Sequence, residues 1–315
     1  MKKPNASNTN PRAEGQNAAH PIPAESLGKS LVEAAGLAPG LYVTATPIGH
    51  ARDITLRALE ALKACDLIAA EDTRVTSKLL AIYGLSKPMT PYNDHNGERE
   101  RPRLLAKLRA GQRIVLVSDA GTPLVSDPGF KLVRAALAEG IAVHALPGAS
   151  APLAALTLSG LPSDRFLFAG FLPSKRGERR TSLEALRTNA VTLIFFESAQ
   201  RLGECLADMA EIFGERQACV ARELTKLHEE IRRDTLAELA AHYGDVDPPR
   251  GEITLVVGGA VQGQVDFSTL DRLLESALAF MPVRAASDLL AEALDLPRRA
   301  VYDRALARKK RDDAD

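Results

Sequence analysis

The segment with the most distinctive chemistry in this sequence is 118–129, which reads SDAGTPLVSDPG. It follows an apolar run and precedes a helix-like pattern that begins at Phe130. Small residues at Ala120 and Gly121 let a ligand approach the backbone closely, and two prolines restrict the loop. A strand–helix connection normally needs ~2–6 residues. This longer, polar segment is therefore interpreted as a ligand-binding loop, with a turn that binds nothing as the alternative.

Two other loops share the small residues and proline of this segment. They read TPIG at 46–49 and LPGAS at 146–150, and each follows a β-prone run. Ligands of open α/β sheets bind outside the carboxyl ends of the strands. Three such loops at strand ends predict one small-molecule pocket.

Several familiar chemistries are disfavoured because their motifs are missing from the sequence. It has no G-x-G-x-x-G after the first strand, no G-x-x-x-x-G-K-[ST] and no G-x-S-x-G. These absences argue against a dinucleotide-binding Rossmann site, a P-loop ATPase and a serine-nucleophile elbow.

Charged clusters also stand where strands are expected to end. They read EDTR at 71–74, NDHN at 93–96, ES at 197–198 and RELTK at 222–226. Helix capping explains any one of them equally well, because Asp, Thr and Ser are good N-caps and Glu suits a first helical turn. Four clusters in comparable places favour a polar active cleft.

The elements that must position these loops alternate between strand and helix, which predicts an α/β fold. The run IVLVS at 114–118 has no polar alternation, which is typical of a parallel strand buried on both faces. Asp53 and either Asp72 or Thr73 are predicted to cap helices. The second half has more strands in close succession, which predicts a mixed sheet. The predicted strands are 41–46, 67–70, 114–118, 141–146, 166–171, 192–196, 218–222, 229–234 and 253–257.

The domain organisation predicted from these patterns has four parts. Residues 1–38 are a disordered tail, 39–160 and 161–262 are two α/β domains, and 266–315 is a helical appendage. The appendage is expected to hold two helices, 285–293 and 297–310, in a helix-turn-helix-like hairpin. A bare hairpin used for packing or dimerisation is the alternative.

The composition excludes several classes of protein. The chain has 315 residues, of which 45% are hydrophobic and 25% charged, which excludes a fibrous or wholly disordered protein. Lys+Arg and Asp+Glu are both 40, so any nucleic-acid surface must be local. Aromatic residues are 4% and Trp is absent, which argues against a base-stacking platform.

The cysteines and histidines predict neither a disulfide framework nor a metal site. The 3 cysteines are widely spaced, and the 6 histidines form no pair with zinc-ligand spacing. No stretch approaches the ~18 apolar residues of a membrane helix. We expect a soluble, reduced, cytoplasmic protein with no metal and no membrane association.

A basic segment, KRGERR at 175–180, is predicted to be a loop. Solvated charge is its usual interpretation. Together with the basic C-terminal helix, it is also a candidate for phosphate contacts to RNA.

Taken together, these motifs resemble one family, the bacterial ribosomal RNA small subunit methyltransferase I family of the tetrapyrrole methylase superfamily. The resemblance covers about Leu41 to Gly258 and is weaker beyond. It rests on these strings in this order: ATPIG, AEDTR, YNDHN, VSDAGTPLVSDPG, LPGAS, GLPSDRF, GFLPSKRGER, FFES, ARELTK and GEITLVV.

The resemblance implies two α/β domains with S-adenosylmethionine in the cleft between them, usually in a homodimer. It implies methylation of the ribose 2′-hydroxyl of a cytidine in 16S ribosomal RNA, at the decoding centre of the small ribosomal subunit. The cofactor contacts implied by its motifs are Pro47, Ala120, Gly121, Thr122, Val125, Ser150, Ala151, Glu197, Leu224, Glu252 and Ile253.

A general base could assist the transfer, because a ribose hydroxyl is a weak nucleophile near neutral pH. The carboxylates favoured for this role are Glu71, Asp72 and Glu223, while Asp94, His95 and Glu197 stay open. The residues expected to hold RNA are Arg74, Lys175, Arg176, Arg179, Arg180, Arg222, Lys226, Arg298 and Arg299.

Two rival functions fit the same fold. The first is a methyltransferase acting on a small tetrapyrrole-like acceptor, against which the basic segment, the appendage and the AEDTR string argue. The second is a non-catalytic RNA-binding module, against which the intact SDAGTPLVSDPG loop argues.

Overall fold

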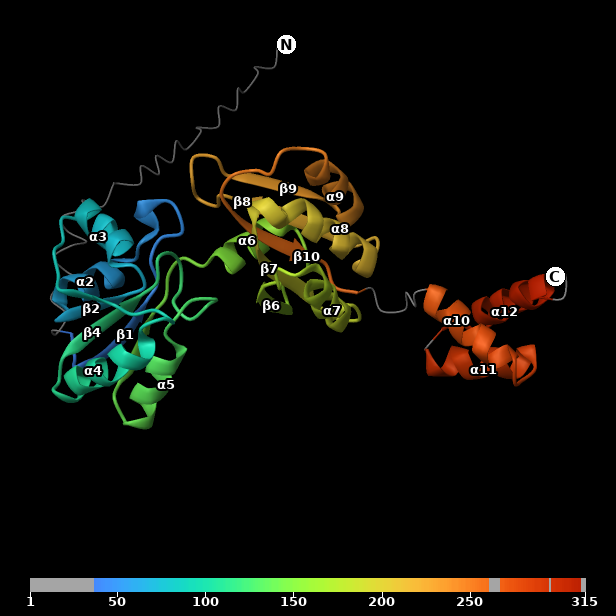
Figure 1. Ribbon diagram of the computed structural model, residues 1–315, viewed down its shortest axis with the longest axis horizontal. Coiled ribbons are helices and arrows are strands. Elements are labelled where there is room, and N and C mark those ends of the chain that lie inside the picture. Colours follow the sequence, from blue (N-terminus) through green and yellow to red (C-terminus); the bar gives the residue numbers. More distant parts are fainter. Residues whose placement is uncertain (1–36, 261–266, 295, 313–315) are drawn as a thin grey trace, which may run out of the picture. The chain divides into compact units, whose positions relative to one another are not determined.

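The structure is a computed structural model that describes residues 37–260, 267–294 and 296–312 (Figure 1). The tail predicted at 1–38 lies outside these residues, except for its last two. The described part contains two five-stranded sheets, each with helices, and a C-terminal group of helices. The predicted α/β fold is thereby confirmed.

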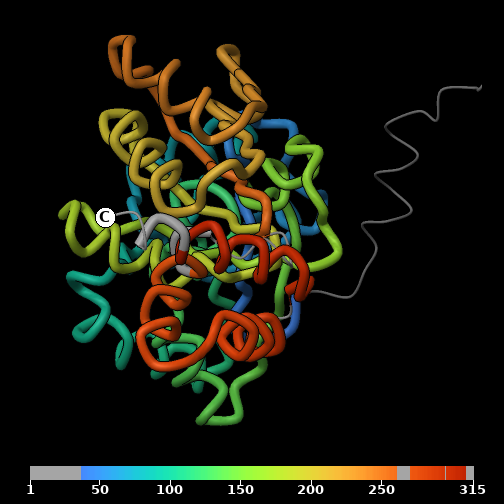
Figure 2. The backbone as a smooth tube through the Cα atoms, turned by 90° about the vertical axis from the view of Figure 1, so that its right-hand side faces the viewer, coloured from blue at the N-terminus to red at the C-terminus, as the bar shows by residue number. Residues whose placement is uncertain are grey.

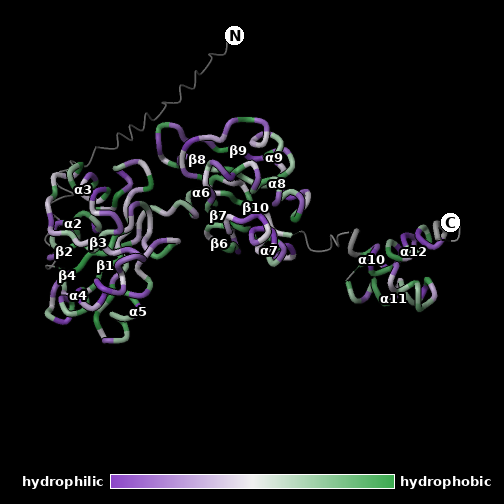
Figure 3. The backbone as a smooth tube through the Cα atoms, in the orientation of Figure 1, coloured by the Kyte–Doolittle hydropathy of each residue, from purple (hydrophilic) through white to green (hydrophobic). Residues whose placement is uncertain are grey.

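The first sheet is entirely parallel, with strand order β3-β2-β4-β1-β5. Its central strand β4 carries the apolar run of the sequence, which is buried on both faces, as predicted. Figure 3 shows this strand mostly in the hydrophobic colour. The strands are β1 (Gly40–Thr44), β2 (Leu67–Ala70), β3 (Met89–Pro91), β4 (Arg113–Val117) and β5 (Val143–Leu146).

Helices cover both faces of the first sheet (Figure 1). Apolar side chains of α4 and α5, such as Leu104 and Leu132, form a buried core with Leu41 and Leu116 of the strands. The helices α2 and α3 lie on the opposite side. The bounds are α2 (Leu56–Ala64), α3 (Thr73–Ile82), α4 (Gly97–Arg109) and α5 (Phe130–Ala138).

One predicted helix cap is confirmed and one is wrong. Asp72 caps α3, since its side chain accepts a hydrogen bond from the Arg74 amide at 2.8 Å. Asp53 caps no helix, because it ends the short 3-10 helix η1 (Ala51–Asp53). Thr55 caps α2 instead, and its hydroxyl accepts from the Ala58 amide at 3.2 Å. Asp53 and Thr55 are both good N-cap residues. Because η1 includes Asp53, helix α2 begins later and Thr55 becomes its N-cap.

The second sheet is mixed, as predicted, with strand order β6-β7-β10-β8-β9. The pair β6–β7 is parallel and the other three pairs are antiparallel. The strands are β6 (Phe166–Phe171), β7 (Thr192–Ser198), β8 (Gln217–Arg222), β9 (Glu230–Thr235) and β10 (Glu252–Val257).

Helices also cover both faces of the second sheet. The larger core joins Leu193, Phe195 and Leu255 of the strands to α7, α8 and α9. The helix α6 packs on the other face, where Leu156 meets Ile194. The bounds are α6 (Ala151–Ser159), α7 (Arg176–Leu186), η2 (Ala199–Arg201), α8 (Leu202–Phe213) and α9 (Leu236–Gly244). The helix α6 lies before residue 160, where the first domain is predicted to end, yet it packs on the second sheet.

The sequence predicts a loop at the basic segment 175–180 because of its glycine and charges. This prediction is wrong, since Lys175 is the N-cap of helix α7 and the helix begins at Arg176. Three of its arginines reach toward Asp208 of α8, and the Arg179 side chain is buried. This ion network holds the segment in a helix that the local composition did not indicate.

The C-terminal group has three helices where two were predicted (Figure 2). They are α10 (Phe267–Leu278), α11 (Val283–Ala293) and α12 (Arg298–Asp312). Leu270 and Leu274 of the additional helix pack against Leu290 and Val301 of the other two. The turn predicted at 294–296 includes residue 295, which lies outside the described residues. No strand occurs in the described part of this region, as expected.

Within the described part of the chain, no helix combines the length and the apolar character needed to cross a bilayer. No group of three or more His, Cys, Asp and Glu side chains suitable for a metal ion occurs among those residues.

Candidate functional site

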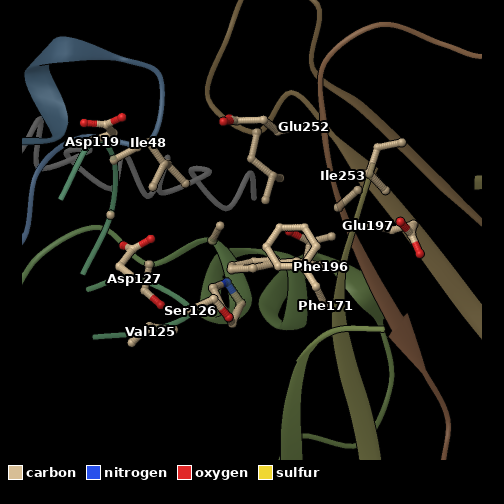
Figure 4. Close-up of a pocket in the computed structure, with 18 of the residues that line it drawn as sticks. Ile48, Asp119, Val125, Ser126, Asp127, Phe171, Phe196, Glu197, Glu252 and Ile253 are labelled. Carbon is tan, nitrogen blue, oxygen red and sulfur yellow. The ribbon is translucent and has the colours of Figure 1, made fainter. Parts of the chain in front are cut away.

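The main cavity among the described residues has a volume of about 430 Å³ (Figure 4). Its first-domain side is built from the residues that follow β1, β2, β4 and β5, at their carboxyl ends. Its second-domain side comes from the ends of β6, β7 and β8 and the start of β10. The volume is in the range of ~300–1,000 Å³ that small-molecule sites occupy.

The three loops predicted to converge are joined to one another by hydrogen bonds. Thr46 and Gly121 form an antiparallel bridge, with N–H···O distances of 2.8 and 3.0 Å. The Thr122 hydroxyl donates to the Ala149 carbonyl at 3.0 Å. These contacts hold the central loop of residues 118–129 against the other two loops at the edge of the sheet.

The second-domain side of the cavity combines aromatic rings with a buried carboxylate. Phe171 and Phe196 pack together with ring centroids 5.4 Å apart, and both line the cavity (Figure 4). Glu197 follows in β7 and is paired in register with Ile253 of β10. A contact across the domains lies nearby, where the His50 amide donates to the Thr225 hydroxyl at 3.0 Å.

The charge of the cavity is one-sided. Five of the described residues that line it are carboxylates. No Lys, Arg or His occurs among these lining residues. Apolar side chains supply much of the remaining wall. Such a site suits a cationic ligand with an apolar part, because carboxylates and aromatic faces both attract positive charge. The carboxylates are Glu71, Asp119, Asp127, Glu197 and Glu252.

Three of these carboxylates lie on the first-domain side and have raised pKa values. Burial raises the pKa of Glu71, and burial also raises that of Asp119. Burial raises the pKa of Asp127 to about 6, with repulsion from Glu71 and Asp119 adding to it and a hydrogen bond with Ser118 opposing it. Titratable groups with such shifts in a cleft are candidates for proton transfer.

The Glu197 carboxylate is anchored at one oxygen and unsatisfied at the other. Its Oε1 accepts from the Ser198 amide at 2.6 Å and from Arg201 Nη2 at 2.5 Å. Its buried Oε2 has no hydrogen-bond partner among the described residues. The carboxylate faces Arg201 and Cys205, on the opposite side of β7 from the Phe196 ring (Figure 4).

The three carboxylates predicted to be catalytic occupy different environments. Glu71 lines the cavity and accepts from the Asp119 amide at 3.2 Å. Asp72 is turned to Arg74, whose hydrogen bonds lower the pKa of Asp72 to about 2, and it does not line the cavity. Glu223 also lies outside the lining. Its pKa is lowered, first by the hydrogen bond that Lys226 donates to it at 2.7 Å.

The residues predicted to contact a cofactor lie together, with one exception. Pro47 does not line the cavity, and the next residue, Ile48, takes that place. The other ten line it: Ala120, Gly121, Thr122, Val125, Ser150, Ala151, Glu197, Leu224, Glu252 and Ile253.

The residues predicted to hold RNA are dispersed, and several have partners within the chain. The Arg74 side chain is 86% exposed although it is paired with Asp72. Arg222 donates to Glu230, and Lys226 donates to Glu223 and Glu252.

At the start of α7, the N-cap residue Lys175 pairs with exposed Glu178, while Arg176, Arg179 and Arg180 all pair with Asp208. The Arg179 side chain is only 1% exposed, so this residue is unavailable for phosphate contacts. Arg298 and Arg299, at the start of α12, are exposed.

Sequence reasoning missed several residues that line the cavity, and four of these have charged or aromatic side chains. Asp119 and Asp127 belong to the loop singled out for ligand binding, but nothing in the sequence distinguished them from its other polar residues. Phe171 and Phe196 end predicted strands, and only the sheet pairing reveals that both rings face the same cavity.

Comparison with known proteins identifies the family. Residues 40–240 match the family model for tetrapyrrole (corrin/porphyrin) methylases, and residues 264–309 match that for the RsmI C-terminal HTH domain. A protein of Mesorhizobium japonicum named ribosomal RNA small subunit methyltransferase I is 52% identical over 284 residues, covering 90% of this chain and 97% of that protein. The chain belongs to the ribosomal RNA small subunit methyltransferase I family.

Other relatives with this name match over similar shares of both chains. The Pseudomonas aeruginosa protein is 45% identical over 85% of this chain and 97% of its own length. The Escherichia coli O157:H7 protein is 46% identical over 84% and 94%. Members of the family are methyltransferases that use S-adenosylmethionine.

Solved structures show the same fold in the tetrapyrrole methylases. The methyltransferase CobJ superposes with a TM-score of 0.54 at 20% identity, covering 73% of this chain and 97% of that chain. The uroporphyrin-III-C-methyltransferase of Thermus thermophilus gives 0.52 at 23% identity, with 71% and 96% covered. At this identity the likeness establishes the fold alone.

Proposed function

We propose that this protein methylates the ribose 2′-hydroxyl of a cytidine in 16S ribosomal RNA, with S-adenosylmethionine as the methyl donor. Family membership supports ribosomal RNA methylation with this donor. The position on the ribose, the cytidine and the decoding centre of the small subunit come from the resemblance of the sequence motifs.

The observation that carries this function is the acidic and partly aromatic cavity at the strand ends. S-adenosylmethionine carries a sulfonium cation, an amino group and an adenine ring. Carboxylates and aromatic faces attract the cation, and the apolar wall suits the ring. The donor supplies an activated methyl group. We propose that the ten lining residues carried over by motif hold it, with Ile48 in place of Pro47.

The acidity of the cavity also bears on the acceptor. A polycarboxylate such as a tetrapyrrole would be repelled by the carboxylates on the first-domain side, Glu71, Asp119 and Asp127, whereas a ribose hydroxyl is neutral. The phosphates of RNA must then stay outside the cavity. Exposed cations such as Arg74, Arg298 and Arg299 are proposed to hold them there.

The chemistry that the protein must supply is positioning and proton acceptance. Methyl transfer to an oxygen is an in-line displacement that needs no covalent enzyme intermediate, so orientation accounts for much of the rate. Of the three carboxylates first favoured, Glu71 is the one that lines the cavity. We place proton acceptance in the cluster of Glu71, Asp119 and Asp127, because burial favours their protonated forms.

The experiment is methyl transfer from labelled S-adenosylmethionine to small ribosomal subunits from cells that lack this gene, followed by nucleoside analysis. Labelled 2′-O-methylcytidine is the expected product. Free 16S RNA, tested in parallel, shows whether the assembled subunit is the substrate. No label in RNA despite donor binding would refute the proposed acceptor.

We also propose that the protein is a cytoplasmic homodimer. The resemblance supports the dimer, and the ribosomal substrate supports the location. Light scattering on the purified full chain should give twice the mass of 33.8 kDa.

A further inference from the structure

A second cavity adjoins the one described above. It has a volume of about 220 Å³ and is lined by the loop after β3, the start of α4 and the start of α5. Asp127 lines both cavities. A transferase needs such a place, because its acceptor must meet the donor while each occupies its own site.

The backbone on both sides of Asp127 is held in an unusual conformation. Leu124 and Ser126 have φ values of 75° and 65°, which side chains other than glycine adopt at a cost of ~1–3 kcal/mol each. Gly129 has φ 131°, and a Cβ there would lie 2.9 Å from side-chain atoms of Leu116 and Leu124. The loop is therefore built to place Asp127 at this junction, and Figure 4 shows its carboxyl group across the main cavity from Phe171 and Phe196.

The charged groups around Asp127 come from four segments. Glu71 and Asp119 lie on the main-cavity side, Asp94 and Glu98 line the smaller cavity, and Lys131 lies at the start of α5. Of these, Glu71 and Asp119 raise its pKa, after the larger effect of burial.

We infer that Asp127 is the general base of the methyl transfer, and that the smaller cavity receives the acceptor nucleotide extruded from the RNA. This rests on the proposed function. Asp127 is then a catalytic residue, and Glu71 acts through it by repelling its negative charge.

The step balances without a further reactant. The O–H bond of the ribose breaks and its proton passes to the Asp127 carboxylate. The oxygen forms a bond to the methyl carbon while the carbon–sulfur bond breaks, and that electron pair neutralises the sulfonium. The products are a methyl ether, a neutral thioether and a protonated Asp127.

The smaller cavity offers surfaces that suit one nucleotide. Its volume of about 220 Å³ lies below the range of drug-sized ligand sites, so it fits only part of an RNA. Phe130 at its edge is 60% exposed, with the Arg134 guanidinium 5.5 Å from the ring centroid. An extruded base stacks on aromatic rings of this kind.

The first test is Asp127→Asn, assayed by single-turnover methylation of small subunits from cells that lack the gene. We expect the rate to fall by about 10²–10⁴-fold while affinity for S-adenosylhomocysteine, measured by calorimetry, stays within about 2-fold. The matched control is Asp247→Asn, which removes an exposed carboxylate outside both cavities and should leave both quantities unchanged.

The second test follows the titration of Asp127 itself. In the enzyme without donor, carboxyl NMR should give a midpoint near 6, which Glu71→Gln should lower. In the wild type, the single-turnover rate should rise with pH through the same midpoint, because the base acts when deprotonated. Asp127→Glu should restore part of the rate lost in Asp127→Asn.

The third test addresses the acceptor. Phe130→Ala should raise the KM for subunits about 10-fold, since base stacking contributes ~1–3 kcal/mol, with kcat little changed. Leu137→Ala is the matched control on the same helix, because Leu137 is 59% exposed and lies outside both cavities.

The outcomes separate the inference from the proposed function. If the wild type labels no RNA, the proposed function fails. If the wild type labels RNA and Asp127→Asn keeps its rate, or the rate shows no limb near pH 6, Asp127 is not the base. An unchanged KM in Phe130→Ala would remove the acceptor from the smaller cavity.

Discussion

The ion network around Asp208 gives a sharp prediction for stability. Asp208 Oδ2 lies 2.7 Å from Arg179 Nη2, and both side chains are 1% exposed. Its Oδ1 lies 3.1 Å from Arg176 and 3.1 Å from Arg180. Burial alone would raise the pKa of Asp208, but the hydrogen bonds from these arginines lower it. The carboxylate is therefore ionised at neutral pH and compensates a buried guanidinium.

Asp208→Asn should lower the free energy of unfolding by about 3–5 kcal/mol, because it leaves one buried charge unpaired. Arg176 is 69% exposed and can turn to water, and Arg180 keeps Glu211 at 2.6 Å. The loss therefore comes mainly from Arg179, whose other acidic neighbour, at 3.6 Å, is 75% exposed.

The assay is urea unfolding followed by far-UV circular dichroism, since the chain has no Trp. With a denaturant slope of about 3 kcal/mol per molar, the midpoint should fall by about 1–1.7 M. The control Glu211→Gln removes an exposed carboxylate and should cost under about 1 kcal/mol. Replacing the pair together, as Arg179→Met with Asp208→Leu, should recover much of the loss. A cost below about 1 kcal/mol for Asp208→Asn would refute the reasoning.

Three further predictions follow from the cavity, the appendage and the surface charges. Phe196→Ala should weaken donor binding by about 5–30-fold through loss of ~1–2 kcal/mol of aromatic contact. The control Phe166→Ala, outside the cavity, should leave donor binding unchanged. Equal donor affinities of the two variants, measured by calorimetry, would contradict the proposed site. Replacing Arg298 and Arg299 with Ala should reduce the slope of log K against log salt for RNA by about 1 each, and an unchanged slope would exclude phosphate contacts there. Hydrogen bonds from Arg113 lower the pKa of Asp66 to about 2, so its contribution to stability is present above pH 3.8 and lost as the pH falls through 2. Asp66→Asn should flatten that part of an acid-unfolding curve. An unaltered curve would contradict this contribution of Asp66.

Much of the first domain could be predicted from the sequence, because its elements are determined locally. The uninterrupted apolar run of β4 indicates burial on both faces, and Asp72 caps α3 within its own segment. Because parallel strands end at one edge of the sheet, the loops that follow them had to converge. This explains why six of the residues predicted to bind the donor, from Ala120 to Ala151, lie together at the cavity, whereas four others come from the second domain.

The roles of individual charges could not be predicted in this way, because they depend on partners distant in the sequence. Arg179 looked like a residue of a solvated loop, but Asp208, far along the chain, buries it in helix α7. Glu71 and Asp72 are neighbours, yet one faces the cavity and the other faces Arg74.

The sequence by itself therefore determined the α/β class and the edge of the sheet that holds the ligand loops. Its motifs also indicated the family. The tertiary structure alone decided which carboxylates face the cavity and that Asp127 lies between two cavities. The physical reason is that strand and loop patterns depend on neighbouring residues. Burial and charge compensation depend on the whole fold, and it is these that set the pKa of a carboxyl group and the partners of an arginine.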